Sequence, residues 1–152
     1  MGYEELLIEA DTKGLIVKEK PLPISKGRIK GKRIAIRHNI PTLKEKACIL
    51  AEEIGHYHTN TMDILDQDNV VNRKLERAGR LWAYDKLIGL HGIVQGYRAK
   101  CRNRCELAEC LGVTEEFLQD ALNCYKEKYG IMTEIDGYII IFEPSLAVIE
   151  KI

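Results

Sequence analysis

The spacing of hydrophobic residues divides this chain into helical segments and short extended segments. Helical spacing predicts a first helix over Tyr3–Thr12, and a longer amphipathic helix that begins after Thr42 and ends near residues 59–60. Further helical patterns begin near Val71 and cover residues 106–129. Glycines at 89, 92 and 96 interrupt the pattern between them, which predicts a kink there.

Short apolar runs beside turn residues predict strands and hairpins. Residues 15–17 form one such run, and apolar positions on both sides of Gly31 predict a hairpin within residues 27–37. The dipeptide Asp136-Gly137 between two apolar runs predicts a type I′ hairpin. Residues 138–142 are apolar on both faces, so we expect a helix or a partner to cover this strand.

Composition places the chain among ordinary globular proteins. Its 152 residues suit one domain with a hydrophobic core, and 45% are hydrophobic while 30% are charged. The 23 basic and 23 acidic residues cancel, so no global field favours nucleic acid or an anionic membrane. The sequence has no run of 18 apolar residues and no signal-peptide pattern, so we expect no membrane segment. Five cysteines without a C-x-x-C motif indicate reduced thiols and a cytoplasmic protein.

Candidate chemistry is concentrated in Glu52-Glu53-x-x-His56, late in the longer helix. The pattern resembles H-E-x-x-H, in which two ligands four residues apart bind one zinc ion and the intervening Glu serves as the base. Here a glutamate occupies the first ligand position, and carboxylate oxygen also binds zinc. The alternative is a solvated, charged helix face that carries a single histidine.

Glu76 is the candidate third ligand. It shares a helical stripe with Gly79 and Ala83, whose small side chains let a neighbouring helix approach closely. If the motif helix packs there, Glu76 joins the site. The alternative is a surface carboxylate paired with Arg73 or Arg80.

These segments together resemble the ImmA/IrrE family of zinc metallopeptidases. Residues 50–57 match its first motif, and Glu76-x-x-Gly79-x-x-Trp82-Ala83 is similar to a second motif of the form E-x-x-A-x-x-F-A. The C-terminal half resembles family members from phages and mobile elements. That likeness lies in residues 106–108, 113–118, 125, 128–130 and 142–144.

The resemblance implies an α+β, minimal zincin-like fold, with helices around a small antiparallel sheet with β-hairpins, as a single domain over residues 1–152. It implies a cytoplasmic endopeptidase that cleaves or inactivates a helix-turn-helix repressor of a prophage, and so regulates lysogeny. Zn²⁺, or another divalent metal, would be bound by Glu52, His56 and Glu76, with Glu53 as general base. Because Glu52 replaces the family's histidine, the alternative is a metal-free regulator that binds a repressor without proteolysis.

Two segments raise the question of nucleic-acid binding. A basic ribbon over residues 26–37 has the charge to contact phosphates, but a solvated sheet face is the favoured interpretation. Residues 106–118 have a helix-turn-helix pattern, yet the second helix opens with Glu115 and Glu116, which repel phosphate. We therefore expect a structural helix pair and no direct DNA binding.

Two further groups carry weaker signals. The spacing of Cys101, Cys105 and Cys110 is not that of common zinc sites, so buried or incidental thiols are favoured over a second metal site. A surface or packing role is expected for the isolated His91.

Overall fold

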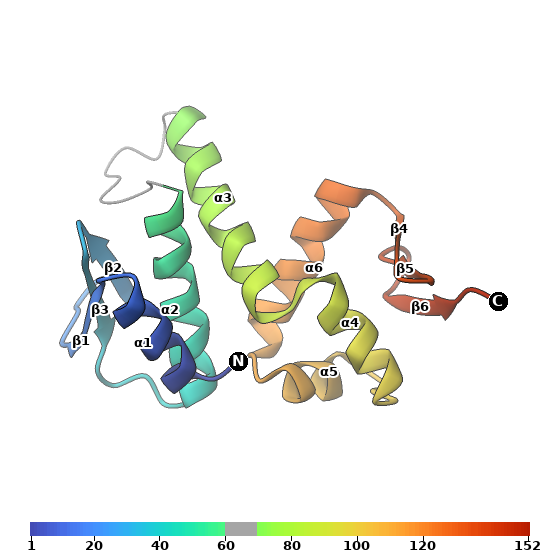
Figure 1. Cartoon of the computed structure of the whole chain (residues 1–152), viewed down its shortest axis with the longest axis horizontal. Coiled ribbons are helices and arrows are strands. Elements are labelled where there is room, and N and C mark those ends of the chain that lie inside the picture. The colour runs from blue at the N-terminus through green and yellow to red at the C-terminus, as the bar shows by residue number, and fades with distance from the viewer. Residues whose placement is uncertain (60–69) are drawn as a thin grey trace. The chain divides into compact units, whose positions relative to one another are not determined.

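The computed structural model describes residues 1–59 and 70–152. These residues divide into two compact units, Met1–Ala83 and Tyr84–Ile152, which are drawn together in Figure 1. The expectation that residues 1–152 form one domain stays a prediction. None of the described helices has the length and apolar character needed to span a membrane.

The chain is an α+β protein, as the sequence predicts, and its helices and strands follow the order labelled in Figure 1. The elements are α1 (Tyr3–Thr12), β1 (Ile16–Lys20), β2 (Gly27–Lys30), β3 (Arg33–Arg37), α2 (Leu43–His58), α3 (Val70–Leu87), α4 (Gly89–Arg98), α5 (Arg104–Leu111), α6 (Glu115–Tyr129), β4 (Met132–Ile135), β5 (Tyr138–Ile141) and β6 (Ala147–Glu150).

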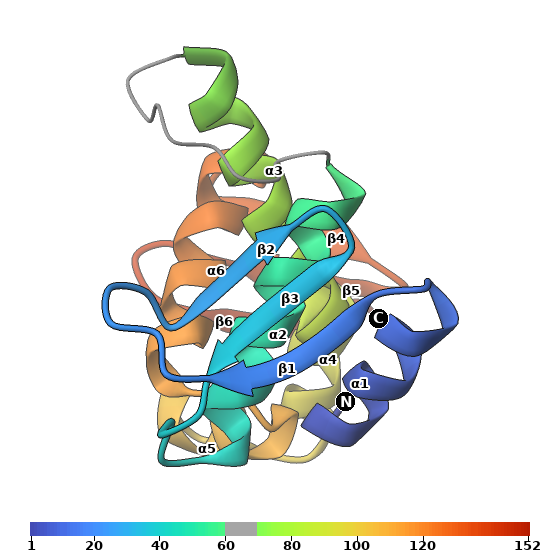
Figure 2. The ribbon, with the colours of Figure 1, turned by 90° about the vertical axis from the view of Figure 1, so that its left-hand side faces the viewer.

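The first sheet has the strand order β1-β3-β2 and packs one face on α2, as Figure 2 shows. β2 and β3 form the predicted antiparallel hairpin, with Gly31 in the left-handed conformation at φ 61°. The first sheet is mixed rather than antiparallel, because β1 pairs with β3 in parallel. After β1 the chain places β2 at the far edge and returns through the middle, so β3 runs in the direction of β1.

The helix α2 begins where the sequence predicts. The Thr42 hydroxyl accepts a hydrogen bond from the Glu45 backbone N–H at 3.2 Å, which satisfies one of the free donors of the first turn. The Glu45 carboxylate accepts from Lys26 at 2.6 Å. The buried stripe of α2 meets the inner face of the first sheet, and the core of this unit includes Leu6, Ile34, Ile36, Leu50 and Ile54.

In the second unit, the three glycines do not kink a continuous helix. α3 ends at Leu87, and α4 begins at Gly89 with a positive φ of 64°. Gly92 and Gly96 lie within α4, where they make room for side chains of α5. A methyl group on Gly96 would lie 2.2 Å from Leu107 Cδ1. Gly92 and Gly96 thus permit close helix packing, whereas Gly89 lies at the break between α3 and α4.

The helices α5 and α6 form the predicted pair. Thr114 accepts a hydrogen bond from the Phe117 N–H at 3.1 Å and caps α6. Phe117, Leu118 and Tyr125 are buried, and the Tyr125 hydroxyl accepts from the Gly89 N–H at 3.2 Å. The buried stripe of α6 therefore serves packing, as expected for a structural helix pair.

The second sheet has the order β4-β5-β6 and is antiparallel throughout. Asp136 and Gly137 have φ values of 47° and 80°, the two left-handed residues that a type I′ turn requires. The strand β5 lies in the middle, with Tyr138 and Ile140 buried. The sequence reasoning missed β6, the strand that covers the second edge of β5.

Candidate functional site

The structure brings His56 of α2 into contact with Glu76 of α3. His56 Nδ1 lies 3.3 Å from Glu76 Oε2. His56 is 7% exposed, and it is the one buried polar or charged side chain in the part of the chain that the structure describes. A buried imidazole beside a carboxylate from a second helix is an arrangement that the H-E-x-x-H-like spacing alone does not contain.

Two glycines position this pair. Gly55 and Gly79 lie against each other between α2 and α3: a methyl group on Gly55 would lie 2.2 Å from the Gly79 carbonyl oxygen. A methyl group on Gly79 would lie 3.3 Å from the His56 backbone nitrogen. The absence of both side chains lets the helices meet backbone to backbone, which brings His56 and Glu76 to the same place.

Glu53 lies between α2 and the first sheet. A methyl group on Gly27, the first residue of β2, would lie 3.1 Å from Glu53 Oε1 and 2.6 Å from Ile49 Cγ2. Only a glycine fits at this end of β2 because the helix side chains occupy the space of a side chain. The sequence analysis did not identify Gly27. A glycine at the start of a predicted strand was the feature of the sequence that could have indicated this close contact.

The electrostatics of the cluster follow from burial and from its excess of carboxylates. Burial, and then the charges of Glu52 and Glu76, raise the pKa of the Glu53 carboxyl from 4.5 to about 8. Burial lowers the pKa of the His56 imidazole; Glu76 opposes this effect and Arg80 adds to it. At neutral pH His56 is therefore neutral, which is the form that binds metals.

The four candidate residues carry donor atoms that suit a metal ion, but their arrangement suits it less well. Imidazole nitrogen and carboxylate oxygen are zinc ligands, and two helices supply them here. However, among residues 1–59 and 70–152, no group of three or more His, Cys, Asp and Glu side chains is placed to hold a metal ion. The structure thus joins His56 to Glu76 and places Glu52 close enough to act on Glu53 electrostatically. It does not bring the three expected ligands to one point.

Arg80 also contacts Glu76. Its Nη2 lies 3.4 Å from Glu76 Oε1, so the carboxylate is shared between a histidine and an arginine one turn away. Both expectations for Glu76 are therefore met in part: it contacts the motif helix, and it pairs with Arg80. A guanidinium at this distance competes for the oxygen that a metal would need.

His58 lies outside this cluster in the structure. It is the last residue of α2, and its ring stacks on Trp82 of α3 with centroids 4.7 Å apart and planes inclined by 26°. This stack adds a second contact between α2 and α3, three residues along each helix from the Gly55–Gly79 contact. This stack was not among the predictions from the sequence.

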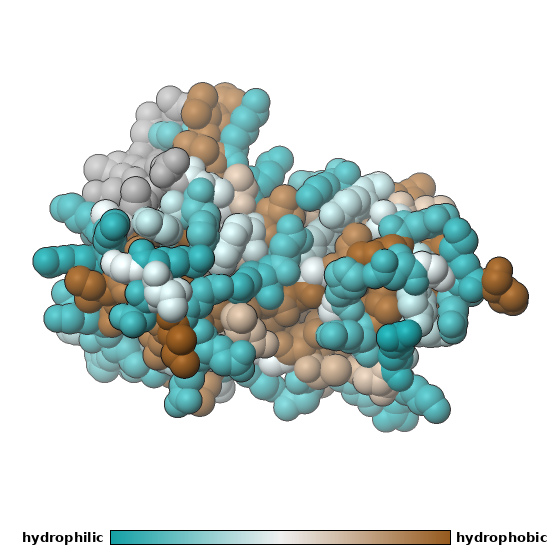
Figure 3. Space-filling view, in the orientation of Figure 1, coloured by the Kyte–Doolittle hydropathy of each residue, from teal (hydrophilic) through white to brown (hydrophobic). Residues whose placement is uncertain are grey.

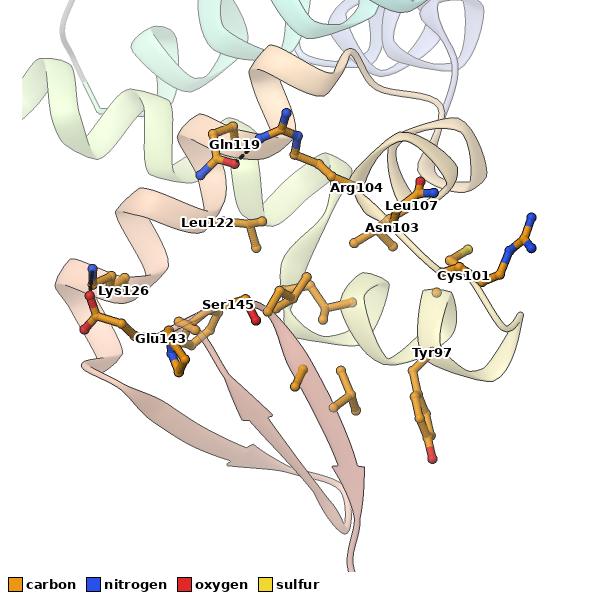
Figure 4. Close-up of a pocket in the computed structure, with 18 of the residues that line it drawn as sticks. Tyr97, Cys101, Asn103, Arg104, Leu107, Gln119, Leu122, Lys126, Glu143 and Ser145 are labelled. Atoms are coloured by element: carbon orange, nitrogen blue, oxygen red, sulfur yellow. Dashed lines mark hydrogen bonds and ion pairs between the residues drawn. The ribbon is translucent and has the colours of Figure 1, made fainter.

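A separate cavity of about 680 Å³ lies in the second unit, between α4, α5, α6 and the segment that joins β5 to β6 (Figure 4). Its walls combine apolar groups with hydrogen-bonded pairs such as Arg104 with Gln119 and Lys126 with Glu143. Cys101 also lines it, and burial, followed by Cys110 and Glu106, raises the pKa of its thiol. A thiol with a raised pKa is a poor nucleophile.

The other sequence candidates are also accounted for in the structure. The described cysteines form no metal-holding group, and Cys101 Sγ lies 3.7 Å from the Glu106 carbonyl oxygen. His91 is exposed beside Asp136, with 3.3 Å between Nδ1 and Oδ2. At the start of α6, Glu115 Oε2 lies 3.6 Å from Arg104 Nη2.

Comparison with known proteins gave no relative: no protein-family model, no curated protein and no solved structure matches this chain.

Proposed function

We propose that this chain is a metal-dependent endopeptidase of the ImmA/IrrE type with a zincin-like fold, which cleaves or inactivates a helix-turn-helix repressor in the cytoplasm. The observation that carries the proposal is the contact between His56 and Glu76 across two helices, 3.3 Å apart, with Glu53 beside it. A charged surface helix with one isolated histidine has no need for a buried His–Glu pair. The order of the motifs along the chain adds the family resemblance to this geometry.

In this proposal His56 and Glu76 would hold the metal, and Glu52, whose carboxylate does not meet theirs in the structure, would be the third ligand. Zn²⁺, when bound, supplies the Lewis acidity that polarises a scissile carbonyl and a water molecule. The residues of the chain do the rest. Glu53 takes a proton from the water at its carboxylate and passes that proton to the leaving amine.

The raised pKa of Glu53 has a consequence for this role. A general base has to be ionised, and a carboxyl with a pKa of about 8 mostly retains its proton at pH 7. A cation bound beside Glu53 would lower that pKa, because it would counter the charges of Glu52 and Glu76. The base and the metal would therefore be coupled, because a bound cation would raise the fraction of Glu53 that is ionised at neutral pH.

The position of Glu53 also suits an extended peptide substrate. It contacts Gly27 at the start of β2, and β2 is one of the two outer strands of the order β1-β3-β2. The backbone groups of an outer strand can pair with an added strand. A peptide paired along β2 would pass the Glu53 carboxylate, and the pairing would hold the peptide backbone in an extended conformation for attack.

The second candidate is a regulator that binds a repressor without cutting it. It is favoured by one specific observation: Arg80 occupies Glu76 Oε1 at 3.4 Å, and the described residues form no three-donor group. A guanidinium already neutralises the carboxylate that the metal would use.

Zinc titration of the full chain by calorimetry tests the metal site. The proposal predicts one equivalent of bound Zn²⁺ in the wild type and at least about tenfold weaker binding after His56→Ala or Glu76→Gln, because each removes a ligand. Glu116→Gln, an exposed glutamate on α6, is the matched control and should bind as the wild type does. A wild-type chain that stays folded and binds no zinc supports the regulator.

Proteolysis is tested separately with a reporter gene under a helix-turn-helix repressor that the chain inactivates. Glu53→Gln keeps the fold and both contacting ligands but removes the base, so it should abolish derepression and leave the repressor at full length on a gel. If Glu53→Gln relieves repression as well as the wild type does, the chain acts by binding alone.

A further inference from the structure

The outer face of the first sheet carries a dense set of cations. Side chains alternate along a strand, and the isoleucines that point toward α2 are buried. The intervening positions therefore point away from the helix, and Figure 2 looks onto this side of the sheet with no described element in front of it. We name this surface the basic face, and it comprises Lys18, Lys20, Arg28, Lys30, Arg33 and Arg37.

Strand pairing sets these cations in rows. Arg33 of β3 pairs with Ile16 of β1 and with Lys30 of β2, and the next outward row consists of Lys18, Ala35 and Arg28. Rows are about 6.8 Å apart along the strands, and neighbours within a row are about 4.8 Å apart. The parallel pairing of β1 adds Lys18 and Lys20 to the cations of the β2–β3 hairpin.

The basic face has no acidic residue among its outward positions. The one acid in these three strands is Glu19, which pairs with Ile36 and so belongs to the inner side, where its carboxylate lies 2.7 Å from Lys46 Nζ. The chain as a whole has a formal net charge of zero, so this face is a local concentration of charge. Hydrophilic residues accordingly predominate at the left edge of Figure 3, where the first sheet lies.

We infer that the basic face binds the phosphate backbone of double-stranded nucleic acid without reading its sequence. Repeated cations in rows match a repeated anion, and a duplex offers one phosphate per about 3.4 Å along each strand. The three strands contain no aromatic residue, so the stacking contacts typical of single-strand binders are absent. They also contain no Asn or Gln for reading base edges.

The expected binding is weak and steeply dependent on salt. Four phosphate contacts, from Lys18, Lys20, Lys30 and Arg33, give a slope of about −3.6 for log K against log salt. Affinity should therefore fall about 150-fold between about 50 and about 200 mM NaCl. At physiological salt the Kd should lie at about 10⁻⁴ to 10⁻⁶ M and vary little with base sequence.

Fluorescence anisotropy with the full chain and a labelled DNA duplex tests this inference. Lys18→Gln/Lys20→Gln removes two contacts, so the loss of affinity over the same salt range should fall to about 12-fold. The matched control, Lys74→Gln/Lys100→Gln, removes the same charge from exposed positions elsewhere and should keep the loss at about 150-fold. Lys30→Gln/Arg33→Gln repeats the test on β2 and β3, in case the β1 variant does not fold.

Poly-glutamate of similar length provides the competing anion. It should bind at least about tenfold more weakly than the duplex at the same salt, because its charges lack the spacing of a duplex. The inference is overturned if no duplex binding occurs at low salt, or if the β1 variant and its control have equal salt slopes. Equal or tighter binding of poly-glutamate would also overturn it and would assign the basic face to an acidic protein. The β1 variant and its control leave Glu53, His56, Glu76 and β2 unaltered, so their outcome is independent of the proposed peptidase.

Discussion

Gly55 of α2 lies directly against the carbonyl group of Gly79 in α3. A methyl group on Gly55 would be 2.2 Å from that oxygen, whereas a methyl group on Gly79 would be 3.3 Å from its nearest neighbour, the His56 backbone nitrogen. The two positions thus differ in how well they tolerate an added side chain, although both are glycines within helices at the same helix crossing. Because backbone atoms cannot move aside as side chains do, this contact sets how closely His56 and Glu76 approach.

Gly55→Ala should therefore destabilise the protein more than Gly79→Ala. We expect Gly55→Ala to lower the free energy of unfolding by about 2–3 kcal/mol, since overpacking against backbone forces the helices apart. Gly79→Ala should cost less than about 1 kcal/mol, because the gain in helix propensity offsets a smaller displacement. Urea denaturation of the three proteins measures the difference. Equal costs would show that the helices are not held at this contact.

Glu53→Gln should change how stability depends on pH. The Glu53 pKa is raised to about 8 in the folded metal-free chain, so the folded state binds the proton more tightly than the unfolded state does. The resulting stability is present below about pH 4.5 and is lost as the pH rises toward about 8. Relative to the wild type, the variant should gain on the order of 2–4 kcal/mol between about pH 5 and about pH 8.

Urea denaturation at both pH values, in the presence of a chelator, measures this gain. Glu116→Gln is the control, because an exposed glutamate should show no such difference between the two pH values. A Glu53→Gln variant whose stability follows the wild type across the range would mean that Glu53 titrates normally.

Substitutions of Glu52 test whether this position is a metal ligand. Glu52→His creates the full H-E-x-x-H pattern, and two imidazoles with one carboxylate form a common catalytic zinc set, so zinc should bind more tightly. Glu52→Ala should loosen zinc by about tenfold or more. Calorimetric titration of the wild type and both variants decides the matter. Identical affinities in all three would remove Glu52 from the site.

Arg80→Gln should raise the pKa of His56. Arg80 contributes to the lowered pKa of this imidazole, and its removal also frees the Glu76 carboxylate to favour the charged form. Burial remains the largest cause, so the pKa should rise only in part. NMR titration of the His56 ring protons in metal-free protein measures the shift. Lys74→Gln on the same helix should leave the titration unchanged, and a His56 pKa that is insensitive to Arg80 would contradict the contact.

Local structure was determined largely by the sequence itself. The boundaries of α1 and α2, the hairpin at Gly31 and the type I′ turn at Asp136-Gly137 follow from hydrophobic spacing, helix capping and turn chemistry. Each of these depends on residues only a few positions apart, so the neighbouring residues carry the information. The spacing of Glu52, Glu53 and His56 on one helix is known in the same way.

Contacts between distant segments were decided only by the tertiary structure. The contact of His56 with Glu76 depends on two glycines that let α2 and α3 meet, and Arg80 shares the same carboxylate. The basic face likewise needs the parallel pairing of β1 with β3, which adds Lys18 and Lys20 to the hairpin cations. Neither arrangement has a signature in local spacing, because strand order and helix approach depend on packing among segments far apart in the chain.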